Sequence, residues 1–157
     1  MKIENKKVEN TELSKILMNL KEITVNIFGD KLISMILFGS YARRNFKENS
    51  DIDLLIITNK NIDFDLSSLR KLSLLNFGKK VDLHIFSKED VLKNLKNLSP
   101  MFVTLLLGNK ILYDKERFFE TALENFVERV SDTQIKYCEG GKIWEMQKIA
   151  RNLKILQ

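Results

Sequence analysis

Two aspartates placed one residue apart are the first sign of chemistry in this sequence. Asp51 and Asp53 open an apolar run that continues to Ile57. A carboxylate on a half-buried strand is costly unless a cation or a hydrogen-bond donor compensates it. Because strand side chains alternate between faces, both carboxylates point to the same side. The pair therefore predicts a site for a divalent cation.

A third carboxylate, Asp82, lies in another apolar run. If the first two strands are adjacent and antiparallel, and a helical crossover returns the third parallel to the second, the three acids meet at one edge of the sheet. The C-terminal end of the first strand, with Gly39 and Ser40, reaches the same edge. The three expected strands span residues 32–38, 51–58 and 81–86.

Three converging aspartates repel one another unless cations are bound between them. Two Mg²⁺ ions would relieve this repulsion, because they take carboxylate and phosphate oxygens and can support an in-line displacement at phosphorus. Gly39 permits a close approach of the backbone, and Ser40 can hold a phosphate. Arg43 and Arg44 are within reach of the outer phosphate oxygens.

Gly39-Ser40, ten residues and Asp51-Ile52-Asp53 together resemble the motif of the nucleotidyltransferase superfamily, which includes DNA polymerase beta, the CCA-adding enzymes and the aminoglycoside nucleotidyltransferases. The chain is most similar to the minimal nucleotidyltransferases found as antitoxin partners of HEPN toxins. The family's third acid maps onto Asp82. The resemblance covers about residues 20–114.

The resemblance implies a role for each of these residues. Asp51 and Asp53 would hold two Mg²⁺ ions, and Asp82 would bind the catalytic ion and help to deprotonate an acceptor hydroxyl. Ser40 and Arg43 would grip the β- and γ-phosphates of the nucleotide. Many members have glycine where this chain has Arg44, so either the turn is tightened differently here or Arg44 adds a phosphate contact.

His84 shares a strand face with Asp82 by alternation. We interpret it as a polar residue on the covered face of the sheet, with contact to a substrate as the alternative.

The resemblance implies an α+β fold of the nucleotidyltransferase (polymerase beta-like) type, which is a small mixed sheet flanked by helices, here with a C-terminal helical extension. Apolar residues at helical spacing predict a first helix from residue 10 or 11 to 28, a short helix at 40–46 and a helix from 66 to Gly78. Ser87 with Asp90 predicts a capped helix, Pro100 predicts the first turn of the next, and residues 110–113 predict an edge strand.

Beyond residue 115 the apolar stripe is strongly helical. The Gly140-Gly141 pair breaks it, and a last short helix is expected to carry Ile143 and Met146 with Trp144 beside it. We therefore divide the chain into a nucleotidyltransferase domain at 1–114 and a helical extension at 115–157. This extension packs on the domain or lies at an oligomer interface.

Composition narrows the function classes. No apolar stretch reaches the length of a membrane span, and the N-terminus lacks the apolar centre of a signal peptide, so a cytoplasmic protein is expected. The lone Cys138 excludes an internal disulfide or a cysteine-based zinc site. The net charge of +5 is spread along the chain, so direct binding of nucleic acid is not expected.

The leading hypothesis is a Mg²⁺-dependent enzyme that transfers a nucleoside monophosphate, AMP from ATP, to a hydroxyl with release of pyrophosphate. The acceptor would be a protein side chain of a HEPN-type toxin, since the chain is short for a tRNA-binding domain or an antibiotic pocket. Two alternatives stay open, namely an antitoxin that acts by complex formation alone and a small-molecule enzyme of the aminoglycoside type. Homo-oligomer formation also stays open.

Overall fold

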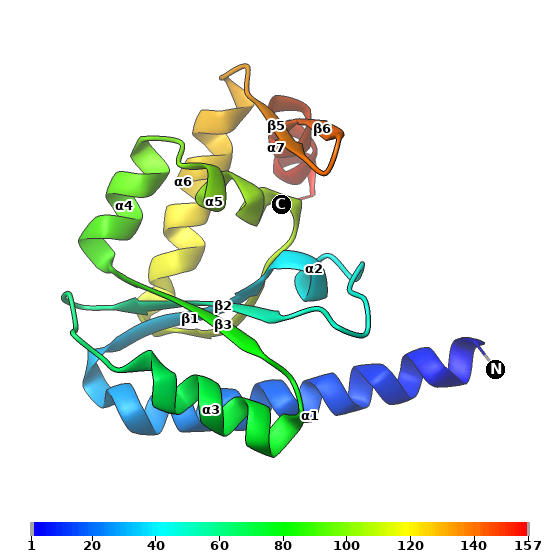
Figure 1. Cartoon of the computed structure of the whole chain (residues 1–157). Coiled ribbons are helices and arrows are strands. Elements are labelled where there is room, and N and C mark those ends of the chain that lie inside the picture. The colour runs from blue at the N-terminus through cyan, green and yellow to red at the C-terminus, as the bar shows by residue number, and fades with distance from the viewer. Residues whose placement is uncertain (1, 157) are drawn as a thin grey trace.

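A four-stranded mixed sheet lies between two layers of helices (Figure 1). The computed structural model describes the backbone of residues 2–156 and the side chains of residues 11–67, 69–71, 74 and 77–156. The main elements are α1 (Lys2–Phe28), β1 (Leu32–Phe38), α2 (Gly39–Ala42), β2 (Ile52–Thr58), α3 (Leu66–Phe77), β3 (Val81–Ser87), α4 (Lys88–Lys96), α5 (Pro100–Thr104), β4 (Lys110–Asp114), α6 (Phe118–Ser131), β5 (Lys136–Glu139), β6 (Lys142–Glu145) and α7 (Met146–Ile155).

The strand order is β3-β2-β1-β4. β1 pairs antiparallel with β2 and with β4, and β2 pairs parallel with β3. The β1–β2 and β2–β3 pairings are those expected from the sequence. For β4 the sequence predicted only an edge strand, and the structure adds that its partner is β1. The fold class is confirmed as a mixed α+β architecture whose small sheet is flanked by helices.

Each face of the sheet has its own apolar core, because alternate residues of every strand point to opposite sides. On one face, Leu54 and Ile56 pack with residues of α1 and α3. On the other face, Leu55 and Ile57 pack with residues of α4, α5, α6 and α7. Asp53 belongs by alternation to the second face. The acids therefore lie on the side of the sheet that α4–α7 cover.

Local signals in the sequence explain where several helices begin and end. Ser87 caps α4 by accepting a hydrogen bond from the Asp90 N–H at 3.1 Å, and Pro100 occupies the first turn of α5, as predicted. Gly78 ends α3 with a φ of 60°. The predicted apolar stripe of α3 also includes Leu72 and Leu75, whose side chains lie outside the described residues.

Three predicted elements are wrong in extent or type. α1 begins at Lys2 and not at residue 10 or 11, because a helix can continue past the end of its apolar stripe. α2 ends at Ala42, before Arg44 takes a positive φ of 58°. Ile143 and Trp144 lie in β6 of a β-hairpin, β5–β6, and the predicted last helix begins only after them, at Met146. Gly140 and Gly141 turn this hairpin, both with positive φ.

Asp114, the last residue of β4, joins the sheet to α6. Its carboxylate accepts a hydrogen bond from the buried Ser34 hydroxyl of β1 at 2.6 Å. The same carboxylate accepts the backbone N–H groups of Phe119 and Glu120 at 2.9 and 3.0 Å. These donors belong to the first turn of α6, whose N–H groups have no partner within the helix. A division of the chain at residue 114 stays a prediction.

Among residues 2–156, none of the helices combines the length and the apolar content that a bilayer crossing requires.

Candidate functional site

Gly39 lies directly against Asp53 at the edge of the sheet. Phe38, the last residue of β1, is the register partner of Asp53 on β2, so the next residue along the chain meets the Asp53 side chain. A Cβ atom built on Gly39 would fall 2.0 Å from Asp53 Oδ2, and the φ of Gly39 is +70°. Both the contact and the left-handed backbone require glycine here.

Asp53, Asp82 and His84 form a compact group of metal-ligand side chains. Asp53 and Asp82 are register partners on the parallel strands β2 and β3. One ligand atom from each of the three residues lies within 4.8 Å of the other two. His84 Nε2 lies 3.5 Å from Asp82 Oδ2, and Arg70 Nη2 of α3 lies 3.4 Å from Asp82 Oδ1. Asp82 is thus held between a histidine and an arginine.

Asp51 lies one residue before β2, outside this compact group. Its carboxylate forms an ion pair with Lys80 Nζ at 2.9 Å, and the hydrogen bond from Lys80 to Asp51 raises the pKa of the lysine. Asp51 and Asp53 nevertheless line the same cavity. The structure therefore brings the three predicted aspartates to one edge, with Asp53 and Asp82 in the tighter arrangement.

Asp53 is a half-buried carboxylate. Among the described residues, no basic side chain forms an ion pair with it. Burial raises its pKa, and the neighbouring Asp82 raises it further. His84 acts in the opposite direction, as does Arg43 more weakly. A carboxylate that has lost water without gaining a cation fits a bound hard metal ion. The donor set of two carboxylates and one imidazole is compatible with a divalent ion at this position.

The cavity beside these acids has a volume of about 490 Å³ and contains the predicted phosphate-binding residues. Gly39, Ser40 and Arg43 line it together with Asp51 and Asp53. The Arg43 stem passes close to Gly108, where a Cβ would come 3.0 Å from Arg43 Cγ. Arg43 Nε is buried without a hydrogen-bond partner. A guanidinium group that lines a cavity suits an anionic ligand.

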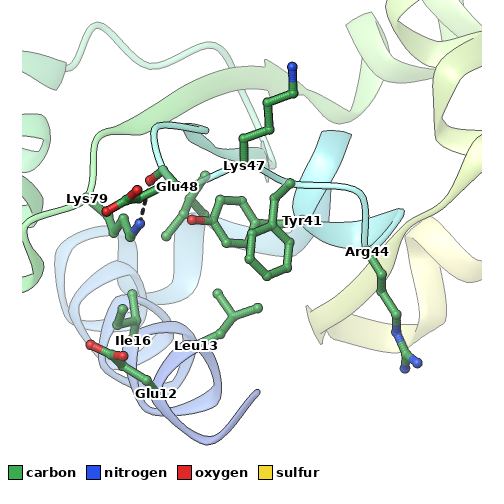
Figure 2. Close-up of a pocket in the computed structure, with 10 residues that line it drawn as sticks. Glu12, Leu13, Ile16, Tyr41, Arg44, Lys47, Glu48 and Lys79 are labelled. Atoms are coloured by element: carbon green, nitrogen blue, oxygen red, sulfur yellow. Dashed lines mark hydrogen bonds between the residues drawn. The ribbon is translucent and has the colours of Figure 1, made fainter. Parts of the chain in front are cut away.

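Arg44 does not line this acidic cavity. It lines a second, larger cavity of about 560 Å³ between α1 and the segment after α2, on the other face of the sheet (Figure 2). The stacked rings of Tyr41 and Phe46 form part of its wall, and Lys79 donates a hydrogen bond to the Glu48 carbonyl there. Asp51, Asp53 and three predicted phosphate-binding residues line the smaller cavity, so chemistry and not size identifies the candidate site.

Several residues of the site were not assigned to it from the sequence, among them His84, Tyr137 and Glu139. His84 was interpreted as a polar residue of the covered face, although alternation along β3 already placed it beside Asp82. Tyr137 and Glu139 of β5 line the acidic cavity. The Gly140-Gly141 pair between two alternating segments was a hairpin signal. No local signal indicates that this hairpin folds over the edge of the sheet.

Comparison with known proteins identifies the family. A family model described as "Nucleotidyltransferase domain" matches residues 17–113, which is more than half of the chain. The chain belongs to the nucleotidyltransferase domain family. The matched segment contains Gly39, Ser40, Arg43 and all three aspartates. The predicted membership of the nucleotidyltransferase superfamily is confirmed, and so is the predicted enzyme class at the level of the family.

Similar proteins are found by sequence and by structure. A Methanocaldococcus jannaschii protein named as a candidate protein adenylyltransferase is 33% identical over 126 residues, covering 76% of this chain and 84% of that protein. A second protein of that organism with the same type of name is 39% identical over 59 residues, which cover 38% of this chain and 58% of the relative.

A solved structure has a fold similar to that of this chain. It is a crystal structure of a toxin-antitoxin with AMP-PNP, and the match has a TM-score of 0.50 at 20% sequence identity. The match covers 71% of this chain and 84% of that chain. At this identity the likeness concerns the fold alone.

Proposed function

We propose that this chain transfers AMP from ATP to a hydroxyl group of a protein side chain. In the reaction the acceptor oxygen bonds to the α-phosphorus, the bond from that phosphorus to the bridging oxygen breaks, and pyrophosphate leaves. The observation that carries the proposal is the shared cavity of Gly39, Ser40, Arg43, Asp51 and Asp53, with Asp82 as the register partner of Asp53. Curated relatives named as protein adenylyltransferases support AMP as the transferred group and a protein as the acceptor.

The phosphate-binding part of the site is built from the segment after β1. Arg43 and Ser40 line the cavity, and the buried Nε of Arg43 has no hydrogen-bond partner. Charge-assisted hydrogen bonds from a guanidinium to phosphate oxygens are about twice as strong as neutral ones. These two residues would hold the β- and γ-phosphates, which leave as pyrophosphate.

Asp51, Asp53 and Asp82 would hold two Mg²⁺ ions, and His84 lies within reach of the same position. When bound, such ions neutralise the charge that develops on the phosphate oxygens. Asp82 would also accept the proton of the acceptor hydroxyl. His84 and Arg70, at 3.5 and 3.4 Å from the two Asp82 oxygens, would keep its carboxylate oriented.

The narrower part of the proposal is that a HEPN-type toxin supplies the acceptor side chain. It rests on the motif resemblance to the minimal nucleotidyltransferases. The toxin-antitoxin crystal structure is consistent with it through the fold alone. Under this proposal the protein works as an antitoxin by covalent modification of its partner.

The decisive experiment follows the label of α-³²P-ATP into protein in the presence of Mg²⁺ and a candidate toxin. We expect labelling by the wild-type chain and none by the Asp51→Asn, Asp53→Asn double variant. Asp63→Asn is the matched control, because Asp63 is exposed and follows the C-terminal end of β2, whereas Asp51 and Asp53 lie at its N-terminal end. Label transfer that survives in the double variant would refute the assignment of the acids. Full toxin neutralisation by that variant would favour an antitoxin that acts by binding alone.

A further inference from the structure

The acidic cavity is closed on one side by the β5–β6 hairpin, which no part of the nucleotidyltransferase motif includes. The hairpin is a separate two-stranded sheet on the same side of the main sheet as α5, α6 and α7 (Figure 1). Tyr137 anchors it by packing against the core of that face and against Trp144, with ring centroids 5.6 Å apart. Glu139, at the end of β5 next to the Gly140-Gly141 turn, lines the cavity.

Glu139 faces the arginine that would hold the phosphates. Glu139 Oε2 lies 3.8 Å from Arg43 Nη2, within ion-pair distance but longer than a hydrogen bond. The Arg43 side chain is 20% exposed and that of Glu139 is 53% exposed. Arg43 is thus fixed in the wall of the cavity, whereas Glu139 has solvent to move into. Among the described residues, no other acidic side chain forms an ion pair with Arg43.

The charges around the cavity make this pair unfavourable for a bound triphosphate. Asp51 and Asp53 already line the cavity, and Glu139 adds another carboxylate. A phosphate that hydrogen-bonds to Arg43 must replace the Glu139 carboxylate there. If that carboxylate stays in place, it repels the phosphate. Without nucleotide, the Glu139 carboxylate therefore lies beside Arg43 where a phosphate would bind.

We infer that Glu139 sets the affinity of the site for its nucleotide by competing with the phosphates for Arg43. The inference rests on the proposed function, since it takes a nucleoside triphosphate as the ligand. Glu139 is a positioning residue and does not take part in the transfer. The Glu139 side chain is 53% exposed, so its carboxylate can withdraw into solvent when the phosphates arrive.

The test measures the Kd of an ATP analogue with a methylene group between the α- and β-phosphorus, in the presence of Mg²⁺, so that no transfer occurs. We expect Glu139→Gln to lower the Kd about two- to fivefold, the range that an exposed ion pair accounts for. The matched control is Glu145→Gln in β6 of the same hairpin. Glu145 pairs with Lys148 and does not line the cavity, so its Kd should equal that of the wild type.

Two further measurements separate competition from a structural effect of the hairpin. The gain in affinity from Glu139→Gln should be smaller in an Arg43→Gln background, because there is then no guanidinium for which Glu139 and the phosphates compete. It should also shrink when salt rises from about 0.05 M to about 0.5 M, since salt screens exposed charges. In turnover, Glu139→Gln should lower the KM for ATP more than it changes kcat.

The outcomes distinguish this inference from the proposed function. If the wild type binds no nucleotide with Mg²⁺, the proposed function fails and the inference fails with it. If the wild type binds nucleotide and Glu139→Gln leaves the Kd unchanged or raises it, the inference alone is overturned. Circular dichroism and the Tm of each variant show that the comparison is made between folded proteins.

Discussion

Asp53 is an acid whose charge is unfavourable in the metal-free fold. Burial and the neighbouring Asp82 raise its pKa, so the folded state binds the proton more tightly than the unfolded state does. We therefore predict that Asp53→Asn raises the Tm of the metal-free protein at neutral pH while abolishing AMP transfer. Thermal unfolding in the presence of a chelator measures this, with the exposed Asp63→Asn as the control.

The pH dependence of this effect has a definite sign. The destabilisation by Asp53 is fully present above its raised pKa, shrinks as the pH falls through that pKa, and is gone below the ordinary pKa of an aspartate. The Tm difference between Asp53→Asn and the wild type should follow the same course and be largest at neutral pH. A difference that grows in acid would contradict the raised pKa.

Gly39 offers a test of the close approach between β1 and β2. Gly39→Ala would place a methyl group 2.0 Å from Asp53 Oδ2 at a φ of +70°. We expect it to lower the free energy of unfolding by about 1–3 kcal/mol and to remove activity. Gly78→Ala is the matched control, because Gly78 has a similar φ of +60° but nothing within 4 Å. Equal losses in urea unfolding for the two variants would show that strain alone, and not the contact, matters at Gly39.

The residues of the nucleotidyltransferase motif could be predicted because they lie on short, continuous stretches of chain. Gly39 and Ser40 follow the end of one strand, and Asp51 and Asp53 open its neighbour, so pairing of the two strands is enough to bring them together. Glu139 could not be predicted in this way. Its place beside Arg43 depends on how the chain returns to the sheet about a hundred residues later, and that is decided by packing and not by a local pattern.

At the scale of elements, the turn after α2 places Arg44 in a backbone conformation that favours glycine. Arg44 has a φ of 58°, a conformation that glycine adopts without strain. We predict that Arg44→Gly keeps or raises the stability, by up to about 1 kcal/mol, whereas Arg44→Ala removes the same side chain without that gain. Thermal unfolding of both variants distinguishes the backbone effect from loss of the side chain.

The same two variants decide whether Arg44 touches the nucleotide. Its side chain lines the cavity beside α1 and not the acidic cavity (Figure 2). From this position we expect both variants to bind the ATP analogue with the Kd of the wild type. A Kd at least tenfold higher, which corresponds to a loss of about 1.4 kcal/mol in binding free energy, would instead show that Arg44 contacts the phosphates. That contact is the alternative that the resemblance left open.

The strands of the main sheet were predictable and the hairpin was not, for physical reasons. The stretches 32–38, 52–58 and 81–87 are mostly apolar and bounded by polar or glycine residues, as buried strands are. In the hairpin, Ile143 lies three residues before Met146, so its spacing imitates one turn of the helix that follows. Tertiary packing of Tyr137 and Trp144 stabilises the strands instead.

At the scale of the whole molecule, α6 and the sheet share one core. Phe119 is fully buried among residues of the sheet and of the C-terminal helices. We expect Phe119→Ala to lower the free energy of unfolding by about 3–5 kcal/mol, as a large cavity in a packed core does. Phe118→Ala is the control, because Phe118 is only partly buried and should cost less. Urea denaturation measures both.

The bonds of Asp114 also determine what would happen to a shortened protein. A fragment ending at residue 114 would keep this carboxylate but lose the two α6 amides that it accepts. It would also expose to water the side chains of Ile36, Leu55 and Ile57, which α6 and α7 help to cover. Such a fragment should precipitate when it is expressed alone, even though it contains every residue of the nucleotidyltransferase motif. A protease that nicks the Gly140-Gly141 turn should instead leave both pieces associated.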